Sequence, residues 1–261
     1  MRRRLRLWWI LATNSFKSQM ATSLASTGYL IGKVMRFVFF LIYLLAIFKR
    51  LPSLKGYDMP AVVLFFMTFN LVDVGAQFLF RGLYAVKGLI DEGDFDKILT
   101  QPVHVLFRIS SMGVDLLDLL TLIPIGVVTF WTLTKLTHPI TITGVLIYLL
   151  LVINAMVIAY AFHVLVGALS VRTQEFESAI WVYRDVMTLG RFPVSVYSEI
   201  IRMALVTVVP IGVMISFPAE ALLGLLSWKG VCYALGLGIL FHGGAQSFWK
   251  RSLQAYSSNS T

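Results

Sequence analysis

Long apolar stretches alternate with short polar connections along the chain. A membrane-spanning helix needs about 20 mainly apolar residues, and six stretches meet or approach that length. The pattern therefore predicts an all-α fold, a polytopic membrane helical bundle of about six spans. The whole chain, 1–261, is expected to form a single transmembrane domain. The predicted spans cover residues 30–48, 61–80, 114–133, 142–169, 200–217 and 231–248.

The segment before the fifth stretch does not fit this simple count. Residues 176–191, FESAIWVYRDVMTLGR, are apolar on one side but carry Arg184 and Asp185. They form either a cytoplasmic amphipathic helix followed by a span, or a short polar-faced span. In the second arrangement a re-entrant pair of half-helices follows, broken near Pro210 and Pro218, which a membrane tolerates only where protein or water satisfies the freed backbone. The pattern leaves both arrangements open.

The N-terminal segment predicts a helix that lies on the membrane rather than through it. Tryptophan on an apolar helix face, with arginines near the helix start, is typical of an interfacial helix. We therefore expect an N-terminal interfacial amphipathic helix within residues 1–29. Its apolar core is too short for a cleaved signal peptide. The apolar positions at helical spacing are Leu5, Trp8, Trp9, Ala12, Phe16 and Met20.

Composition agrees with a lipid environment. Hydrophobic residues make up 58% of the chain and charged residues only 13%, whereas soluble domains have about 25% charged residues. The net charge of +9 comes from basic residues that flank apolar stretches, which indicates contact with anionic lipid and no nucleic-acid partner. The single cysteine, Cys232, excludes an internal disulfide and is expected to be buried. The four histidines lack ligand spacing, so no metal site is predicted.

The distribution of Lys and Arg predicts the orientation. Cytoplasmic loops carry an excess of these residues. We therefore expect both termini and residues 84–108 to face the cytoplasm of a bacterial inner (plasma) membrane. The basic residues then predicted outside are Lys49, Arg50, Lys55, Lys135 and Lys229.

The loop between the second and third stretches has its own helical pattern. Gly93 suits a helix end because glycine adopts the left-handed conformation easily. Asp94 suits the cap of a short second helix, which Pro102 would end. With no other core in the loop to cover it, the apolar face of this helix is expected to be exposed to the cytoplasm. The residues of that face are Phe95, Ile98 and Leu99.

Four stretches carry a resemblance to a known family: LPSLKGYDMPAVVLF, LIDEGDFDKILTQPVHVLF, RFPVSVYSEIIRMALVTVVPIGVMISFPAEALLG and LQAYSSNST. They resemble the permease subunits of type-2 ATP-binding-cassette exporters, in particular a bacterial group of transport permeases. The resemblance implies that residues 84–104 form a cytoplasmic coupling segment that docks on a separate ATPase subunit. It implies no substrate. The residues that match the coupling element are Glu92, Gly93, Asp94, Asp96, Leu99 and Pro102.

The resemblance also implies that nucleotide binding and the translocation pathway belong to different subunits. The nearest string to a nucleotide-binding loop, GYLIGKV from Gly28, has the wrong spacing and lacks the Ser or Thr after its lysine. We therefore expect no cofactor and no catalytic chemistry on this chain, with ATP and Mg²⁺ on the partner ATPase. A second permease chain, identical or related, would complete the translocation pathway.

A few polar residues lie inside the predicted spans. Asn70, Asp73 and Gln77 are spaced to share one helix face, and Asn154 and His163 lie in the fourth stretch. Polar groups at that depth usually face a bundle interior or a watery cavity, which makes them candidates for a translocation pathway or a subunit interface. Local hydrogen bonding between packed helices is the alternative for each of them.

Two other functions fit parts of the pattern. An ion-driven secondary transporter would use Asp73 and would require internal repeats with paired broken helices. An intramembrane hydrolase would bring His163 or His242 within hydrogen-bond distance of Glu175 or Glu177 in one cavity. Convergence of these residues in space distinguishes the hydrolase from a permease.

Overall fold

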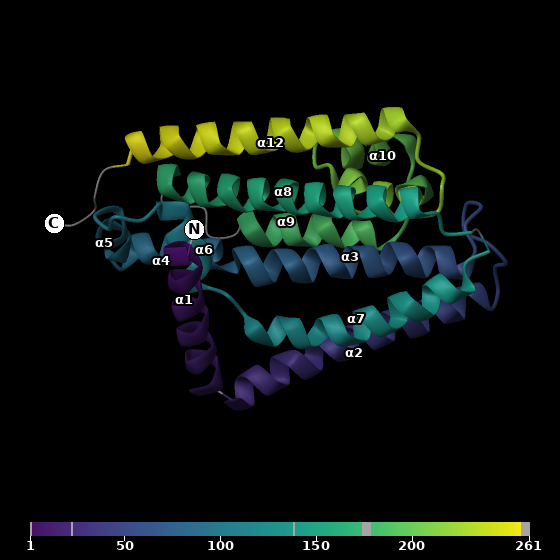
Figure 1. Ribbon diagram of the computed structural model, residues 1–261, viewed down its shortest axis with the longest axis horizontal. Helices are drawn as coiled ribbons and strands as arrows, with labels where there is room; N and C mark the ends of the chain where they lie inside the picture. The colour runs from purple at the N-terminus through teal and green to yellow at the C-terminus, as the bar shows by residue number, and fades with distance from the viewer. Residues whose placement is uncertain (1, 22, 138, 174–178, 257–261) are drawn as a thin grey trace.

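Long helices run side by side through most of the computed structural model (Figure 1), which describes residues 2–21, 23–137, 139–173 and 179–256. Within these ranges the only β-type pairing is an isolated bridge between Leu54 and Tyr57, in the loop between the first two long helices. The predicted all-α helical bundle is thereby confirmed.

Four helices are long and apolar enough to cross a membrane, and they correspond to the first four predicted stretches. The second of them, α3, is capped by the Asp58 carboxylate, which accepts a hydrogen bond from the Ala61 amide at 3.0 Å. It continues through a 3₁₀ turn, η1 (Arg81–Ala85), into α4 (Val86–Asp91). The four helices are α2 (Ser23–Phe48), α3 (Met59–Phe80), α7 (Leu116–Lys135) and α8 (Ile142–Thr173).

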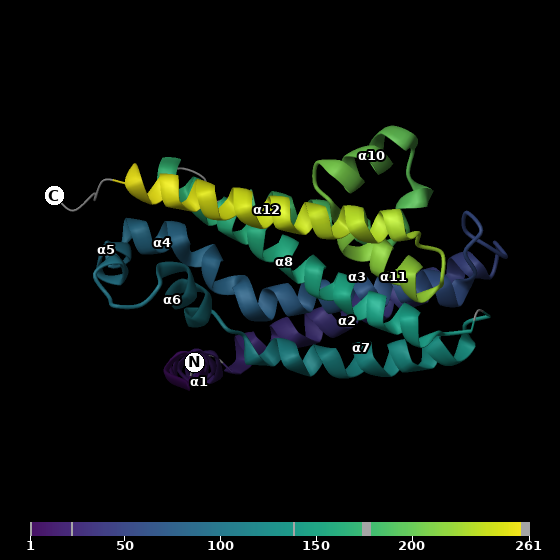
Figure 2. The same ribbon diagram turned by 45° about the horizontal axis from the view of Figure 1, so that its top comes forward.

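The sixth predicted stretch forms α12 (Trp228–Gln254), which packs against α8 and crosses it at an angle (Figures 1 and 2). Its 27 residues are about 40 Å long at 1.5 Å per residue. Glycines and the polar His242 and Gln246 make it less apolar than the four helices above. The described chain therefore has four candidate spans by length and composition, or five with the bent pair below, instead of about six. Cys232 is exposed on α12, contrary to expectation.

The chain between α8 and α12 crosses the bundle in short pieces. A bend of 78° separates two of them, α10 and the helical run at Gly212–Leu222. Pro210 lies at this break. Proline has no amide hydrogen to donate to a helix, so it interrupts the helical hydrogen bonds. Pro218 instead lies in the first turn of a helix, a position that proline tolerates. The pieces are α9 (Ala179–Met187), η2 (Thr188–Arg191), η3 (Val194–Val196), α10 (Glu199–Thr207), the π-helical turn η4 (Gly212–Ser216) and α11 (Phe217–Leu222).

This region consists of a short polar-faced helix followed by a bent pair, which by length and composition forms either one broken span or a re-entrant loop. Both predicted arrangements therefore stay open. The break near Pro218, which the second arrangement included, does not occur, because Gly212–Leu222 is one helical run. The helix α9 lies beside α8 in Figure 1 with Trp181 and Val182 exposed, whereas α10 projects beyond the bundle in Figure 2.

The N-terminal helix α1 (Arg2–Ala21) runs across one end of the bundle instead of along it (Figures 1 and 2). This orientation is the one expected of an interfacial helix. It is shorter than predicted, because α2 already begins at Ser23. Trp9 is 61% exposed, whereas Ala12 is buried. The side chains of Leu5 and Met20, two members of the predicted apolar stripe, lie outside the described residues.

Two helices of the connecting loop gather at the same end of the bundle as α1 and the last turn of α12 (Figure 1). They are α5 (Asp94–Leu99) and α6 (Val105–Met112), which follow α4. The bundle thus has one elaborated end, whereas short loops make up the other.

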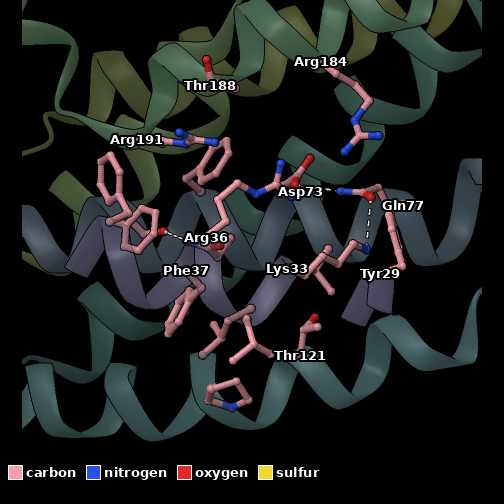
Figure 3. A pocket seen from close by; sticks show the side chains of 18 of the residues that line it. Tyr29, Lys33, Arg36, Phe37, Asp73, Gln77, Thr121, Arg184, Thr188 and Arg191 are labelled. Atoms are coloured by element: carbon pink, nitrogen blue, oxygen red, sulfur yellow. Dashed lines mark hydrogen bonds between the residues drawn. The ribbon is translucent and has the colours of Figure 1, made fainter. Parts of the chain in front are cut away.

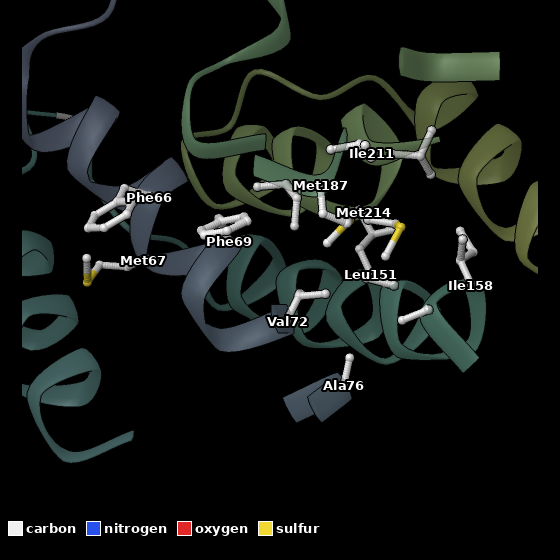
Figure 4. Close-up of a cluster of buried hydrophobic side chains, with 14 of the residues drawn as sticks. Phe66, Met67, Phe69, Val72, Ala76, Leu151, Ile158, Met187, Ile211 and Met214 are labelled. Atoms are coloured by element: carbon white, nitrogen blue, oxygen red, sulfur yellow. The ribbon is translucent and has the colours of Figure 1, made fainter. Parts of the chain in front are cut away.

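Buried apolar side chains form a main core along the bundle and a second core at the elaborated end. In the main core, Met187 and Met214 lie between Phe69 and Ile158 (Figure 4). Methionine is flexible and fills irregular gaps, which suits a site where short helices meet long ones. The second core contains Leu83, Val86, Ile90, Phe95, Ile98, Leu106, Ile109, Ala161, Val164, Ala168, Val171, Ala245 and Trp249.

Candidate transport cavity and coupling surface

A cavity of about 350 Å³ lies between α2, α3, α7 and the α9–η2 segment (Figure 3). Asn70, Asp73 and Gln77 all line it, as their spacing on α3 predicted. From Phe66 to Gln77 the cavity follows twelve residues of α3, which is about 16 Å of helix.

Basic side chains make up an unexpected part of the lining. Of the cationic residues, Arg184 and Arg191 lay in the segment 176–191 that was singled out from the sequence. Lys33 and Arg36 were missed, although their spacing of three residues inside an apolar stretch places both on one helix face. The charged residues of the lining are Lys33, Arg36, Asp73, Arg81, Arg184, Asp185 and Arg191.

A chain of polar contacts joins three helices at one side of the cavity. Gln77 Nε2 donates to Asp73 Oδ2 at 2.7 Å, and Lys33 Nζ lies 3.4 Å from Gln77 Oε1. Lys33 also forms an ion pair with Asp118, whose side chain is 1% exposed. A buried ion pair is stable only with good geometry and further hydrogen bonds. The network therefore requires α2, α3 and α7 to keep their present register.

Aromatic rings surround the cations on the other side. The Arg191 guanidinium lies over the rings of Phe40 and Phe69, 5.4 Å from each centroid, and Arg184 lies 5.3 Å from the ring centroid of Trp181. Such cation–π contacts are attractive because the face of an aromatic ring is negative. The Nε atom of Arg191 is buried without a hydrogen-bond partner among the described residues.

The structure does not bring Asn154 and His163 to this cavity. Asn154 Nδ2 donates to the Ala234 carbonyl of α12 at 2.9 Å. His163 lies between the Ala159 carbonyl, 2.7 Å away, and the Tyr84 hydroxyl, 3.2 Å away. Both are engaged in packing between helices, so the alternative given for them above is the better description.

The coupling segment begins as its sequence predicted. Gly93 has a φ of +72° and separates α4 from α5. However, Gly93 itself occupies the cap position, and Asp94 is the first residue of the helix. Asp94 instead forms an ion pair with Lys97 at 2.6 Å. The prediction of an Asp94 cap was therefore wrong, because the left-handed glycine already makes the turn into the helix.

The predicted exposure of the α5 apolar face was wrong for two of its three residues. Phe95 is 0% exposed and Ile98 is 4% exposed, whereas Leu99 is 37% exposed. Phe95 packs edge-on against Tyr256, with ring centroids 5.1 Å apart. Burial raises the pKa of the Tyr256 phenol, and its hydrogen bond to Asp96 adds to this rise. A segment just after α12, distant in sequence, thus supplies the cover that the loop lacks.

What remains exposed on this loop is a mixed polar and apolar surface, which we call the coupling face. Of the predicted coupling residues, Glu92, Leu99 and Pro102 belong to it, whereas Gly93, Asp94 and Asp96 are half-buried. The coupling face consists of Asp91, Glu92, Lys97, Leu99, Thr100, Pro102 and His104.

Two glycines close the base of the loop. A Cβ atom on Gly82 would lie 2.0 Å from the Ile109 carbonyl oxygen, and one on Gly113 would lie 2.4 Å from Gly82 Cα. A real Cβ atom cannot approach other atoms so closely. The segments η1 and the end of α6 can therefore cross here only if Gly82 and Gly113 lack side chains. The coupling face is therefore held at both ends of its loop.

The residues required by a hydrolase do not converge within the described part of the chain. His242 stacks on Tyr160, with ring centroids 5.9 Å apart, and His163 has the partners given above. Glu175 and Glu177 lie outside the described residues. Across the described ranges, no group of three or more His, Cys, Asp or Glu side chains is placed to hold a metal ion.

Comparison with known proteins gives one result. The model of a family described as ABC-2 family transporter protein matches residues 34–260. The match includes most of the cavity lining, the coupling segment and α12, and it leaves out α1 and the start of α2 with Tyr29 and Lys33. No curated protein matches the chain.

Proposed function

Since the chain belongs to the ABC-2 family of transporter proteins, we propose that it is the transmembrane permease subunit of an ATP-driven exporter. ATP and Mg²⁺ would bind to a separate ATPase subunit that docks on the coupling face. A second permease chain, identical or related, would complete the pathway in a bacterial inner membrane. The end of the bundle that carries α1 and α5 would face the cytoplasm.

The observation that carries this proposal is the way α5 is attached to the bundle. Its buried face, Phe95 and Ile98, belongs to a core that also contains residues of α8 and α12. Its outer face remains exposed. A force applied to α5 therefore reaches α8 and α12 through this shared core, as well as α3 and α7 through the chain. Close-packed interiors transmit displacement because they have little free volume.

The proposal is tested at the exposed leucine of α5. We expect Leu99→Ala to weaken ATPase binding by about 1–3 kcal/mol, as an interface anchor would, and Glu92→Lys to weaken it further by reversing a charge. The measurement is recovery of the ATPase with affinity-purified permease, together with ATP hydrolysis by the complex. Leu225→Ala is the matched control, because Leu225 is 55% exposed and lies at the opposite end of the bundle.

Phe95 is unsuitable for this test. Truncating a fully buried phenylalanine costs about 3–5 kcal/mol of stability, so loss of binding in Phe95→Ala would not separate docking from folding. If Leu99→Ala and Glu92→Lys express normally and retain the ATPase as fully as Leu225→Ala, the coupling face is only a connector and the proposal fails.

A further inference from the structure

The cations of the cavity fall into two groups. Lys33 and Arg81 form ion pairs with Asp118 and Asp115. Their charges are therefore largely neutralised, and both belong to the network that holds α2, α3 and α7 together.

The second group is Arg36, Arg184 and Arg191. No ion pair joins any of the three to a carboxylate in the described ranges. The nearby Asp73 accepts its hydrogen bond from Gln77 instead. Charged groups at this depth are costly unless they have a partner. The guanidinium group also presents a planar set of donors that fits a phosphate or carboxylate.

Apolar surface lies directly beside these arginines. Phe40 and Phe69 flank Arg191, and Phe37 and Phe66 extend the aromatic wall. A small hydrated anion gains nothing from such a wall. A molecule with an anionic head and an apolar body satisfies both surfaces, and the volume of about 350 Å³ lies within the range of ligand cavities.

The cavity also has a route to the surroundings. Arg36 on α2 and Trp181 on α9 both line it, and both are exposed. Only 6% of the most apolar window of α2 is buried inside the protein. An apolar chain leaving the cavity between α2 and α9 would therefore continue along apolar helix surface instead of entering water.

From this arrangement we infer that the cavity binds an amphiphile with a phosphate or carboxylate head group, held by Arg36, Arg184 and Arg191. This inference rests on the proposed function, since it names the class of molecule that the permease would export. The head group lies at the arginines, and the apolar body lies against the phenylalanine wall.

The test measures binding to the purified full-length permease without any ATPase. The probes are short-chain phosphatidic acid, phosphatidylcholine with the same chains, and inorganic phosphate, compared by native mass spectrometry and thermal shift. We expect phosphatidic acid to bind best. We expect Arg191→Gln to lower its affinity at least about tenfold, the effect of losing one charge-assisted hydrogen bond, and Arg191→Lys to lower it less.

Arg202→Gln is the control, because Arg202 pairs with Glu199 on the projecting α10 and does not line the cavity. Equal binding of phosphatidylcholine, or an equal loss in Arg202→Gln and Arg191→Gln, would overturn the inference. Inorganic phosphate binding as tightly as the lipid would also overturn it, because the apolar body would then contribute nothing. If Arg191→Gln does not fold, the same lipid-binding measurement is made on Arg36→Gln, for which we expect a similar loss of affinity. Since no ATPase is present, failure here leaves the coupling proposal standing, and failure of coupling leaves this result unaffected.

Discussion

At the scale of single residues, charge placement is the most consequential feature of this bundle. Lys33 and Asp118 come from helices far apart in the chain and meet in an almost fully buried ion pair. A charge left alone in such a place loses its hydration without compensation. Each residue is therefore tolerated only because the other is present, and the pair holds α2 against α7.

This dependence gives a prediction about stability. Lys33→Met removes one partner and should destabilise the protein by about 3–5 kcal/mol, whereas the double variant Lys33→Met with Asp118→Leu should recover most of the loss. Thermal unfolding of the detergent-purified protein, followed by size-exclusion chromatography, measures both. The exposed pair Lys97–Asp94 is the comparison, because Lys97→Met should cost less than about 1 kcal/mol. A double variant no more stable than Lys33→Met would contradict the expected interdependence.

At the scale of elements, the coupling segment shows how a short loop becomes rigid. Its helices α4 and α5 are only six residues each, and helices of that length are not stable on their own. Burial of Phe95 beneath Tyr256 and the glycine crossing at the base of the loop supply the missing stability. The loop behaves as part of the bundle because its apolar face belongs to one core with residues of α8 and α12.

The close contact between Gly82 of η1 and Gly113 after α6 can be tested by adding a single methyl group at Gly113. Gly113→Ala would place a Cβ atom 2.4 Å from Gly82 backbone atoms, so η1 and α6 must separate. We expect faster hydrogen exchange across residues 82–113 and weaker retention of the ATPase. Gly88→Ala is the control, because a Cβ atom there meets nothing within 4 Å and alanine favours the helix by about 1 kcal/mol. Unchanged exchange in Gly113→Ala would mean that the crossing adjusts without disturbing the loop.

At the scale of the whole molecule, the two ends of the bundle differ in content. One end carries α1, the coupling segment and the last turn of α12, and the other carries the loop at residues 49–58 and the start of α12 (Figure 1). The bias of Lys and Arg toward the first end predicts that it faces the cytoplasm.

Thiol labelling of intact cells tests this orientation. In a Cys232→Ser background, Asp94→Cys should resist a membrane-impermeant maleimide and react only after the membrane is opened. Ser53→Cys, in an exposed position at the other end, should react in intact cells. The reverse pattern would invert the topology and place the coupling face away from any cytoplasmic ATPase.

The sequence by itself determined the four longest apolar helices, the turn at Gly93 and the shared face of Asn70, Asp73 and Gln77, and it offered the break at Pro210 as one of two arrangements. These features depend on apolar length, on the freedom of one glycine, on a missing amide hydrogen and on the spacing of side chains along one helix. All of them depend on residues close together in the sequence, so local sequence patterns are sufficient to predict them.

Only the tertiary structure decided what covers each face. Spacing places Phe95 and Ile98 on one side of a helix, but it does not reveal that Tyr256 lies against Phe95 or that Trp249 belongs to the same core. Likewise, nothing near Arg191 in sequence indicates that Phe40 and Phe69 will enclose it. Contacts between distant segments depend on how whole helices pack, because each apolar face is buried by whichever partner fits its shape. For that reason the coupling face proved smaller than predicted, and the cavity more basic.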